Sequence, residues 1–151
     1  MADHNMDRAG SLPVTPNPLL HTLDPLVGTW RIGGAEFNGT TTFAWMDGGF
    51  YLVQTSESEH NGRRFTAVEY IGYDEDTKTL RSHMMDSAGS NFVYTWRLEG
   101  DHLTVWFGDE GSDNFLGATL DPAGTTVTGA WQWPDGNGGT GGYAATMTRI
   151  G

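Results

Sequence analysis

Glu69 is the residue of this sequence with the clearest capacity for acid–base chemistry. It stands in a β-prone apolar run, and the strand register argued below places it on one face with Gln54, Ser82 and Tyr94. A carboxyl group in an apolar interior has a raised pKa and can act as a general acid or base near neutral pH. A buried polar network whose members satisfy one another is the commoner arrangement. Glu69 and Tyr94 are therefore candidate catalytic residues only if the protein is an enzyme.

The other polar motifs carry weaker signals. His83 is expected on the outer face of its strand, and the remaining histidines lie in the N-terminal stretch or at hairpin ends. No histidine pair has the spacing of a zinc site, and the chain has no cysteine. Acidic clusters at 74–76 and 109–113 lack the ligand pattern of an EF-hand loop, and we interpret them as solvated turns. We expect neither a metal nor a cofactor.

The elements that must position these residues are short β-strands. From Val27 onward, β-rich runs alternate with nine turn signals, which predicts an all-β, antiparallel up-and-down barrel of about ten strands. Residues 19–26 are expected to form a short helical turn that plugs one end of the barrel, with four leucines on one side: Leu19, Leu20, Leu23 and Leu26. Residues 1–18, with three prolines, are interpreted as a flexible leader, and residues 19–151 as the barrel domain.

Tight turns between these strands predict their register. Asn38-Gly39 is expected to be a two-residue hairpin loop, and residues 74–77 a four-residue loop. A three-residue loop is expected to end at Gly89, where a residue without Cβ suits a left-handed conformation. Counting outward from these turns, and from Gly48-Gly49 and Asn61-Gly62, gives the pairs Phe37–Thr40, Phe43–Gln54, Gln54–Glu69, Glu69–Ser82 and Ser82–Tyr94.

One face of the predicted sheet collects the bulky apolar side chains, and we expect it to enclose a ligand cavity. The turn rules do not require this grouping, so it supports the register. Threonines and charged residues populate the opposite face, as on a solvated wall. The side chains expected to contact a ligand are Phe43, Trp45, Leu52, Gln54, Glu69, Ile71, Ser82, Met84, Tyr94, Trp96, Asn114 and Trp131. Leu116 and Trp133 are expected to face inward as well.

Composition limits the partners of such a barrel. The 151 residues suffice for one domain, and a formal charge of -11 repels nucleic acid and anionic membrane surfaces. No stretch approaches the roughly 20 apolar residues of a membrane span. The absence of cysteine is compatible with a reducing cytoplasm. We expect a cytoplasmic protein that binds a small hydrophobic molecule, and an incompletely closed barrel would leave a homodimer possible through its edge strands.

Gly28 and Trp30 at the start of the first strand, with Arg149 near the end of the last, resemble the pattern of the calycin superfamily. This superfamily includes lipocalins, fatty-acid-binding proteins and nitrobindin-like barrels, and the chain is also similar to bacterial calycin-like domains of its size. The resemblance implies that the first strand closes on the last, with the tryptophan under the arginine in a cation–π contact of about 0.5 to 2 kcal/mol. It also implies a ligand cavity inside the barrel.

Two departures from that superfamily narrow the comparison. Asn38-Gly39 leaves no room for the helical lid that fatty-acid-binding proteins insert between their first two strands. Nitrobindin-like proteins bind haem through a late histidine, whereas the last histidine here is His102. Three functions stay open: binding of an apolar or aromatic molecule, an isomerase-, cyclase- or lyase-type enzyme that uses Glu69 or Tyr94, and a haem or gas-binding barrel that would need His83 or another histidine in the lumen.

Overall fold

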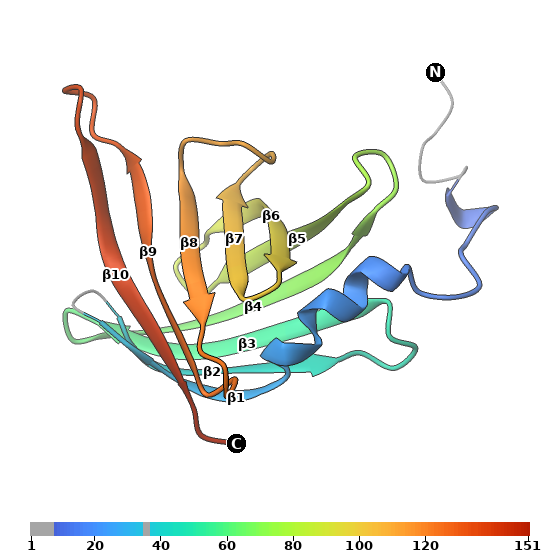
Figure 1. The fold of residues 1–151 in the computed structure, drawn as a ribbon, viewed down its shortest axis with the longest axis horizontal. Coiled ribbons are helices and arrows are strands. Elements are labelled where there is room, and N and C mark those ends of the chain that lie inside the picture. Colours follow the sequence, from blue (N-terminus) through green and yellow to red (C-terminus); the bar gives the residue numbers. More distant parts are fainter. Residues whose placement is uncertain (1–7, 35–36) are drawn as a thin grey trace.

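Ten antiparallel strands follow one another around a closed barrel in the computed structural model, which describes residues 8–34 and 37–151 (Figure 1). Each strand pairs with its neighbours in sequence, and the first pairs with the last, so the predicted up-and-down barrel is confirmed. The strands are β1 (Gly28–Gly33), β2 (Asn38–Trp45), β3 (Tyr51–His60), β4 (Arg63–Asp74), β5 (Thr79–Asp86), β6 (Asn91–Glu99), β7 (His102–Phe107), β8 (Phe115–Leu120), β9 (Thr126–Pro134) and β10 (Thr140–Arg149).

Most of the predicted register is confirmed where a glycine turn sets it. Phe43 lies opposite Gln54, Gln54 opposite Glu69, and Ser82 opposite Tyr94. Gly49, Gly62 and Gly89 all have positive φ, the conformation for which a residue without Cβ is suited.

The prediction of a turn at Asn38-Gly39 is wrong. Both residues belong to β2, Gly39 pairs with Ile32, and the connection from β1 runs through residues 34–37, of which 35 and 36 lie outside the described part. Gly39 is needed for another reason, since a Cβ there would come within 1.9 Å of the carbonyl oxygen of Glu57. Here glycine marks a close approach of two backbones within a sheet. The pairing moves by six residues, an even number, so every side chain keeps its predicted face.

The second correction concerns the loop between β4 and β5. Asp74 still pairs with Thr79, so the loop starts one residue later than predicted, and Glu69 lies opposite Met84 instead of Ser82. Asp74 accepts hydrogen bonds from the backbone N–H and the hydroxyl of Thr77, and Lys78 takes a left-handed φ of 58°. The aspartate thus caps the turn from within the strand. This shift is two residues, again even, and the faces are preserved.

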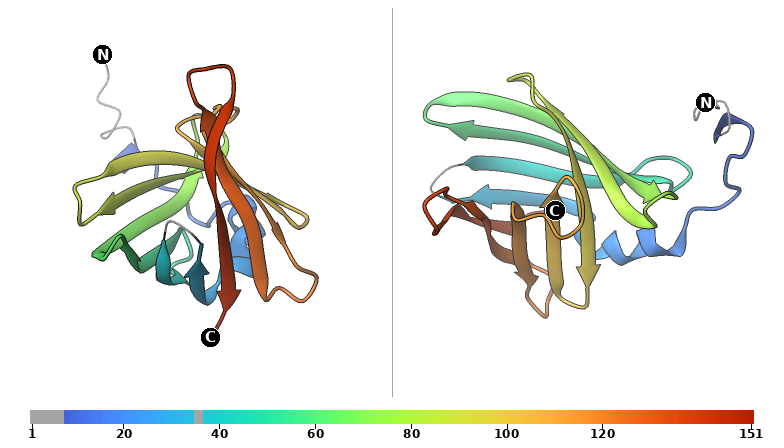
Figure 2. Two further views of the ribbon diagram at one scale, coloured as in Figure 1. Left: turned by 90° about the vertical axis from the view of Figure 1, so that its left-hand side faces the viewer. Right: turned by 90° about the horizontal axis from the view of Figure 1, so that it is seen from above.

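The predicted helical turn is a 3-10 helix, η1 (Pro18–Leu26), at one end of the barrel (Figure 2). It contacts β3, β4 and β6, and Leu20, Leu23 and Leu26 join the core cluster of the barrel. Leu19 was expected on the same side but is 39% exposed. Asn17 caps the helix through its side chain, and Arg8, in the segment before it, forms an ion pair with Asp76 at 2.9 Å.

The closed end of the barrel is built around Trp30, which is fully buried. Its indole N–H donates to the carbonyl of Leu26, and the guanidinium carbon of Arg149 lies 4.2 Å from its ring centroid. Arg149 also donates to the carbonyl oxygens of Pro25, Val27 and Gly124. This single arginine therefore links β10 to the helix end, to β1 and to the β8–β9 turn.

Among the residues that the structure describes, no helix has both the length and the apolar character to cross a membrane.

Candidate functional site

A cavity of about 200 Å³ occupies the barrel interior above the packed end. Its wall is mostly apolar, and three polar side chains reach it: Gln54 from β3, Glu69 from β4 and Tyr94 from β6. Aromatic and aliphatic walls with a few placed polar groups are typical of small-molecule sites. The apolar lining consists of Ile32, Phe43, Trp96, Leu103, Val105, Leu116, Ala118, Val127, Trp131, Ala145 and Met147.

Glu69 is anchored through one oxygen. Its Oε2 accepts a hydrogen bond from the hydroxyl of Ser82 at 2.5 Å and another from the indole N–H of Trp96 at 3.1 Å. The same indole N–H lies 2.9 Å from the Ser82 hydroxyl oxygen, which closes a three-membered network. Ser82 reaches Glu69 diagonally across the strand pair, so the contact survives the register correction.

Burial raises the pKa of the Glu69 carboxyl above its ordinary value, and the hydrogen bonds from Ser82 and Trp96 offset only part of that rise. Some surface of Glu69 stays accessible because the residue borders the cavity. Enclosure by protein affects the ionisation of Glu69 more than this accessibility does. A cavity of this size cannot supply the hydration that a carboxylate has in bulk solvent. Glu69 can therefore hold a proton nearer to neutrality than an exposed glutamate.

Gln54 and Tyr94 present the other polar atoms. The amide nitrogen of Gln54 donates to the Thr41 hydroxyl at 3.0 Å, which leaves the amide oxygen free of partners in the described part of the chain. Tyr94 packs its ring against Phe107 and Trp131, with centroids 5.5 and 5.9 Å away. Burial first, and the nearby Glu69 second, raise the pKa of the Tyr94 phenol well above its usual range. Its hydroxyl stays protonated and can donate a hydrogen bond.

Two neighbouring hollows extend the cavity toward the barrel end opposite η1. One, of about 200 Å³, is bordered by Phe37, Ser58 and Tyr143, and the other, of about 300 Å³, by Phe107, Asn114 and Trp133. Trp131 lines both hollows and the central cavity.

The structure divides the predicted ligand contacts into three groups. Phe43, Gln54, Glu69, Tyr94, Trp96 and Trp131 line the central cavity, and Asn114 borders the outer hollow. Leu52 and Ile71 are fully buried in the packed end, and Trp45 donates its indole N–H to Asp24 of η1. The third group, Ser82 and Met84, is not among the residues that line the cavity. Ser82 donates its hydroxyl hydrogen to Glu69, and Met84 pairs with Glu69 on one side and Phe92 on the other.

Sequence reasoning missed several wall residues, chiefly those late in the chain. Ala118, Val127, Ala145 and Met147 were not assigned, because the register is lost in the loop after Phe107. Leu103 precedes that loop and was overlooked, although it alternates with Val105 on the inner face of β7. Strand alternation counted backward from Arg149 would have found Met147 and Ala145, which occupy every second position of β10.

No histidine of the described residues lines the cavity. His83 is exposed and hydrogen-bonds Asn91, and His60 stacks on Phe37 at a hairpin end. His21 and His102 are exposed as well, and His4 lies outside the described residues. The described histidines therefore do not fit haem ligation in the lumen, and we derive no function from it.

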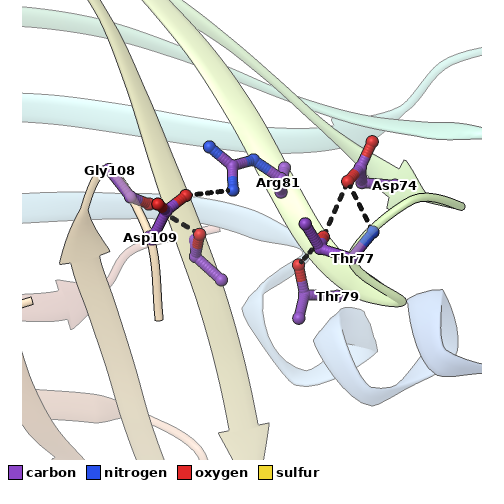
Figure 3. Close-up of polar contacts among 7 residues, drawn as sticks. Asp74, Thr77, Thr79, Arg81, Gly108 and Asp109 are labelled. Carbon is purple, nitrogen blue, oxygen red and sulfur yellow. Dashed lines mark hydrogen bonds and ion pairs between the residues drawn. The ribbon is translucent and has the colours of Figure 1, made fainter. Parts of the chain in front are cut away.

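The acidic clusters are engaged in turns and surface ion pairs (Figure 3). Asp74 holds Thr77, as above, and Arg81 donates to Asp109 at 2.8 Å. Across the described part of the chain, no group of three or more His, Asp or Glu side chains is arranged to hold a metal ion. Thr95 is one of the threonines on the face predicted to be solvated, but it is buried, and its hydroxyl donates a hydrogen bond to the carbonyl oxygen of Gly108.

Residues 15–104 match a family described as protein of unknown function DUF1579. This chain belongs to the DUF1579 family. The DUF1579 match covers η1 and β1 to β6, which carry Gln54, Glu69, Ser82, Tyr94 and Trp96, whereas Trp131 and Arg149 lie beyond it. The network around Glu69 thus lies wholly in the part that defines the family match.

Among solved structures, this DUF1579 chain is similar to the crystal structure of Rv2717c from M. tuberculosis. The TM-score is 0.57 at 16% sequence identity, and the match covers 90% of this chain and 99% of Rv2717c. Likeness at this identity extends to the fold alone. A search of curated proteins gives no match to the sequence.

Proposed function

We propose that this DUF1579 protein binds a small apolar or aromatic molecule in the lumen of its barrel. The observation that carries the proposal is the central cavity, whose walls are apolar and aromatic while three inward polar groups converge from three strands. A site of this composition gains binding free energy from apolar burial and orients the ligand through its few polar atoms. An apolar cavity of about 150 Å³ holds one benzene ring, so about 200 Å³ suits a ring with a short substituent.

Membership of the calycin superfamily is part of this proposal. It is supported by the closed meander and by the stacking of Arg149 on Trp30 at the closed end. Cytoplasmic location is proposed on composition, and a homodimer is proposed as well, although the closed barrel removes the edge-strand route to it. Because β1 pairs with β10, a dimer would need a surface other than those two strand edges.

Native mass spectrometry of protein purified gently from its host, compared with the denatured mass, tests the binding proposal. We expect a reproducible extra mass that is lost on denaturation, and the same spectrum gives the oligomeric state. Ala145→Phe should abolish the extra mass, because this side chain points into the lumen and would fill it. Thr148→Phe, at an exposed position on the outward face of the same strand, is the matched control and should retain it. Equal ligand occupancy in both variants would place the ligand outside the lumen.

A second candidate is an enzyme of the isomerase, cyclase or lyase type acting on an apolar substrate. The raised pKa of Glu69 beside an apolar cavity favours it, since such a carboxyl can donate or accept a proton near neutral pH. Tyr94, whose phenol stays protonated, is suited to donate a hydrogen bond to a developing oxyanion. Glu69→Gln should then abolish turnover while ligand affinity changes little, and unchanged turnover would remove Glu69 from the mechanism.

A further inference from the structure

The polar atoms that face the lumen are mainly acceptors. Glu69 uses Oε2 for both of its protein hydrogen bonds, and no described residue bonds its Oε1. No buried side-chain oxygen or nitrogen among the described residues lacks a partner, so Oε1 must be accessible, and the accessible space beside Glu69 is the cavity. The amide oxygen of Gln54 is unpaired in the same way, and Gln54 lies directly opposite Glu69. The Tyr94 hydroxyl, the third polar group, can accept as well as donate.

The lumen offers nothing to balance a negative ligand. Of the described residues that line it, none is Arg, Lys or His, and Glu69 is the one carboxylic acid. Arg149, on β10, is occupied by Trp30 and three carbonyl oxygens at the closed end. A carboxylate entering this cavity would lose its hydration without a compensating charge.

We infer that the lumen selects a ligand whose buried end is a primary ammonium group on a small apolar body, and that it rejects carboxylates. The ammonium supplies three N–H donors, which match the oxygens of Glu69, Gln54 and Tyr94. Glu69 is already largely enclosed by protein in the empty barrel, so ion pairing mainly adds the desolvation of the ligand and, where Glu69 is protonated, the loss of its proton. This inference rests on the proposed binding function and names the class of ligand for the same site.

Proton release on binding is the second expected property. Burial raises the pKa of Glu69 in the empty cavity, and a bound cation favours its ionised form. The side chains that face Glu69 are Gln54 from β3, Ser82 and Met84 from β5, and Tyr94 and Trp96 from β6. Of these only Tyr94 titrates, and it stays neutral. Binding of an ammonium should therefore release a proton from Glu69 and become tighter as pH rises, up to the pKa of the amine itself.

The test uses three probes of the same size: benzylamine, benzyl alcohol and benzoate. Their affinities for the full-length protein are measured by NMR titration, with the indole N–H signals of Trp96 and Trp131 as reporters of the lumen. We expect the amine to bind about tenfold or more tightly than the alcohol, and benzoate to leave both signals unmoved. Calorimetry of benzylamine in buffers of different ionisation enthalpy should show proton release.

Glu69→Gln keeps the shape and an acceptor for Ser82 and Trp96 but removes the charge. It should bring the affinity for benzylamine down to that for benzyl alcohol and abolish proton release, while the affinity for benzyl alcohol changes less than about threefold. Glu59→Gln, an exposed position on β3, is the matched control and should behave as wild type. Proton release by the wild-type protein remains decisive if Glu69→Gln fails to fold.

The outcomes separate this inference from the proposed function. If the alcohol binds as tightly as the amine and no proton is released, the ammonium inference is overturned while lumen binding stands. If benzoate binds best, the ammonium inference is also overturned, because the lumen then prefers an anion to a cation. If none of the probes shifts the lumen signals, both the inference and the binding of small aromatic molecules are lost.

Discussion

At the scale of single residues, Glu69 links stability to pH. Its pKa is raised in the folded protein by burial, so folding favours its protonated form. The stability from this preference is fully present below the unfolded pKa, near 4.5, and is lost as pH rises through the higher folded value. We predict that the free energy of unfolding of wild type falls relative to that of Glu69→Gln as pH rises from 4.5 toward neutrality. Urea denaturation of both proteins across that range measures the difference.

A difference between the two proteins is the right quantity, because other carboxyls titrate with the opposite sign. Hydrogen bonds to Asp74 and Asp86 lower their pKa, so their stabilisation is present above the unfolded pKa and is lost as pH falls. Both contributions are common to wild type and variant and cancel. A stability difference that does not change with pH would mean that Glu69 is solvated as freely as a surface carboxylate.

At the scale of elements, η1 is the plug of the closed end. Leu23 is 0% exposed within the core cluster, whereas Leu19 on the same helix is 39% exposed. A short helix is marginal without such packing, so its leucines stabilise the barrel and the barrel stabilises the helix. We predict that Leu23→Ala lowers the free energy of unfolding by about 2–5 kcal/mol and that Leu19→Ala changes it by about 0.5 kcal/mol or less, as measured by urea denaturation. Equal effects of the two substitutions would mean that the helix does not pack as a plug.

At the scale of the whole molecule, closure of β1 on β10 depends on the space at Gly28. Its φ is +132°, and a Cβ there would come within 2.4 Å of the Arg149 guanidinium and 2.7 Å of the carbonyl oxygen of Gly151. We predict that Gly28→Ala lowers the free energy of unfolding by about 1–3 kcal/mol, because alanine is strained at this φ and displaces Arg149 from Trp30. Thermal unfolding measures the loss.

Gly33→Ala is the control on the same strand. A Cβ there meets nothing within 4 Å, and its φ is not in the left-handed region. Alanine at this position should leave the melting temperature unchanged or slightly higher, since it restricts the unfolded chain. Similar decreases in melting temperature in both variants would show that β1 tolerates no added methyl group. The close approach of Gly28 to Arg149 would then not be the cause of the loss.

The barrel, the number of its strands and the inner face of β2 to β7 could all be predicted from the pattern of turns and apolar residues. Side chains alternate with a period of two, so even the misplaced turns at Asn38-Gly39 and 74–77, which moved the pairing by even numbers, left Glu69, Gln54 and Tyr94 on the inner face. Which inner residues border a cavity depends on contacts that form when the whole barrel closes. The leucines of η1 fill one end and bury Leu52 and Ile71, while β8 to β10 supply the opposite wall across the lumen. Such contacts join residues far apart in the chain, and no local pattern of turns or alternation encodes how much of the interior they leave empty.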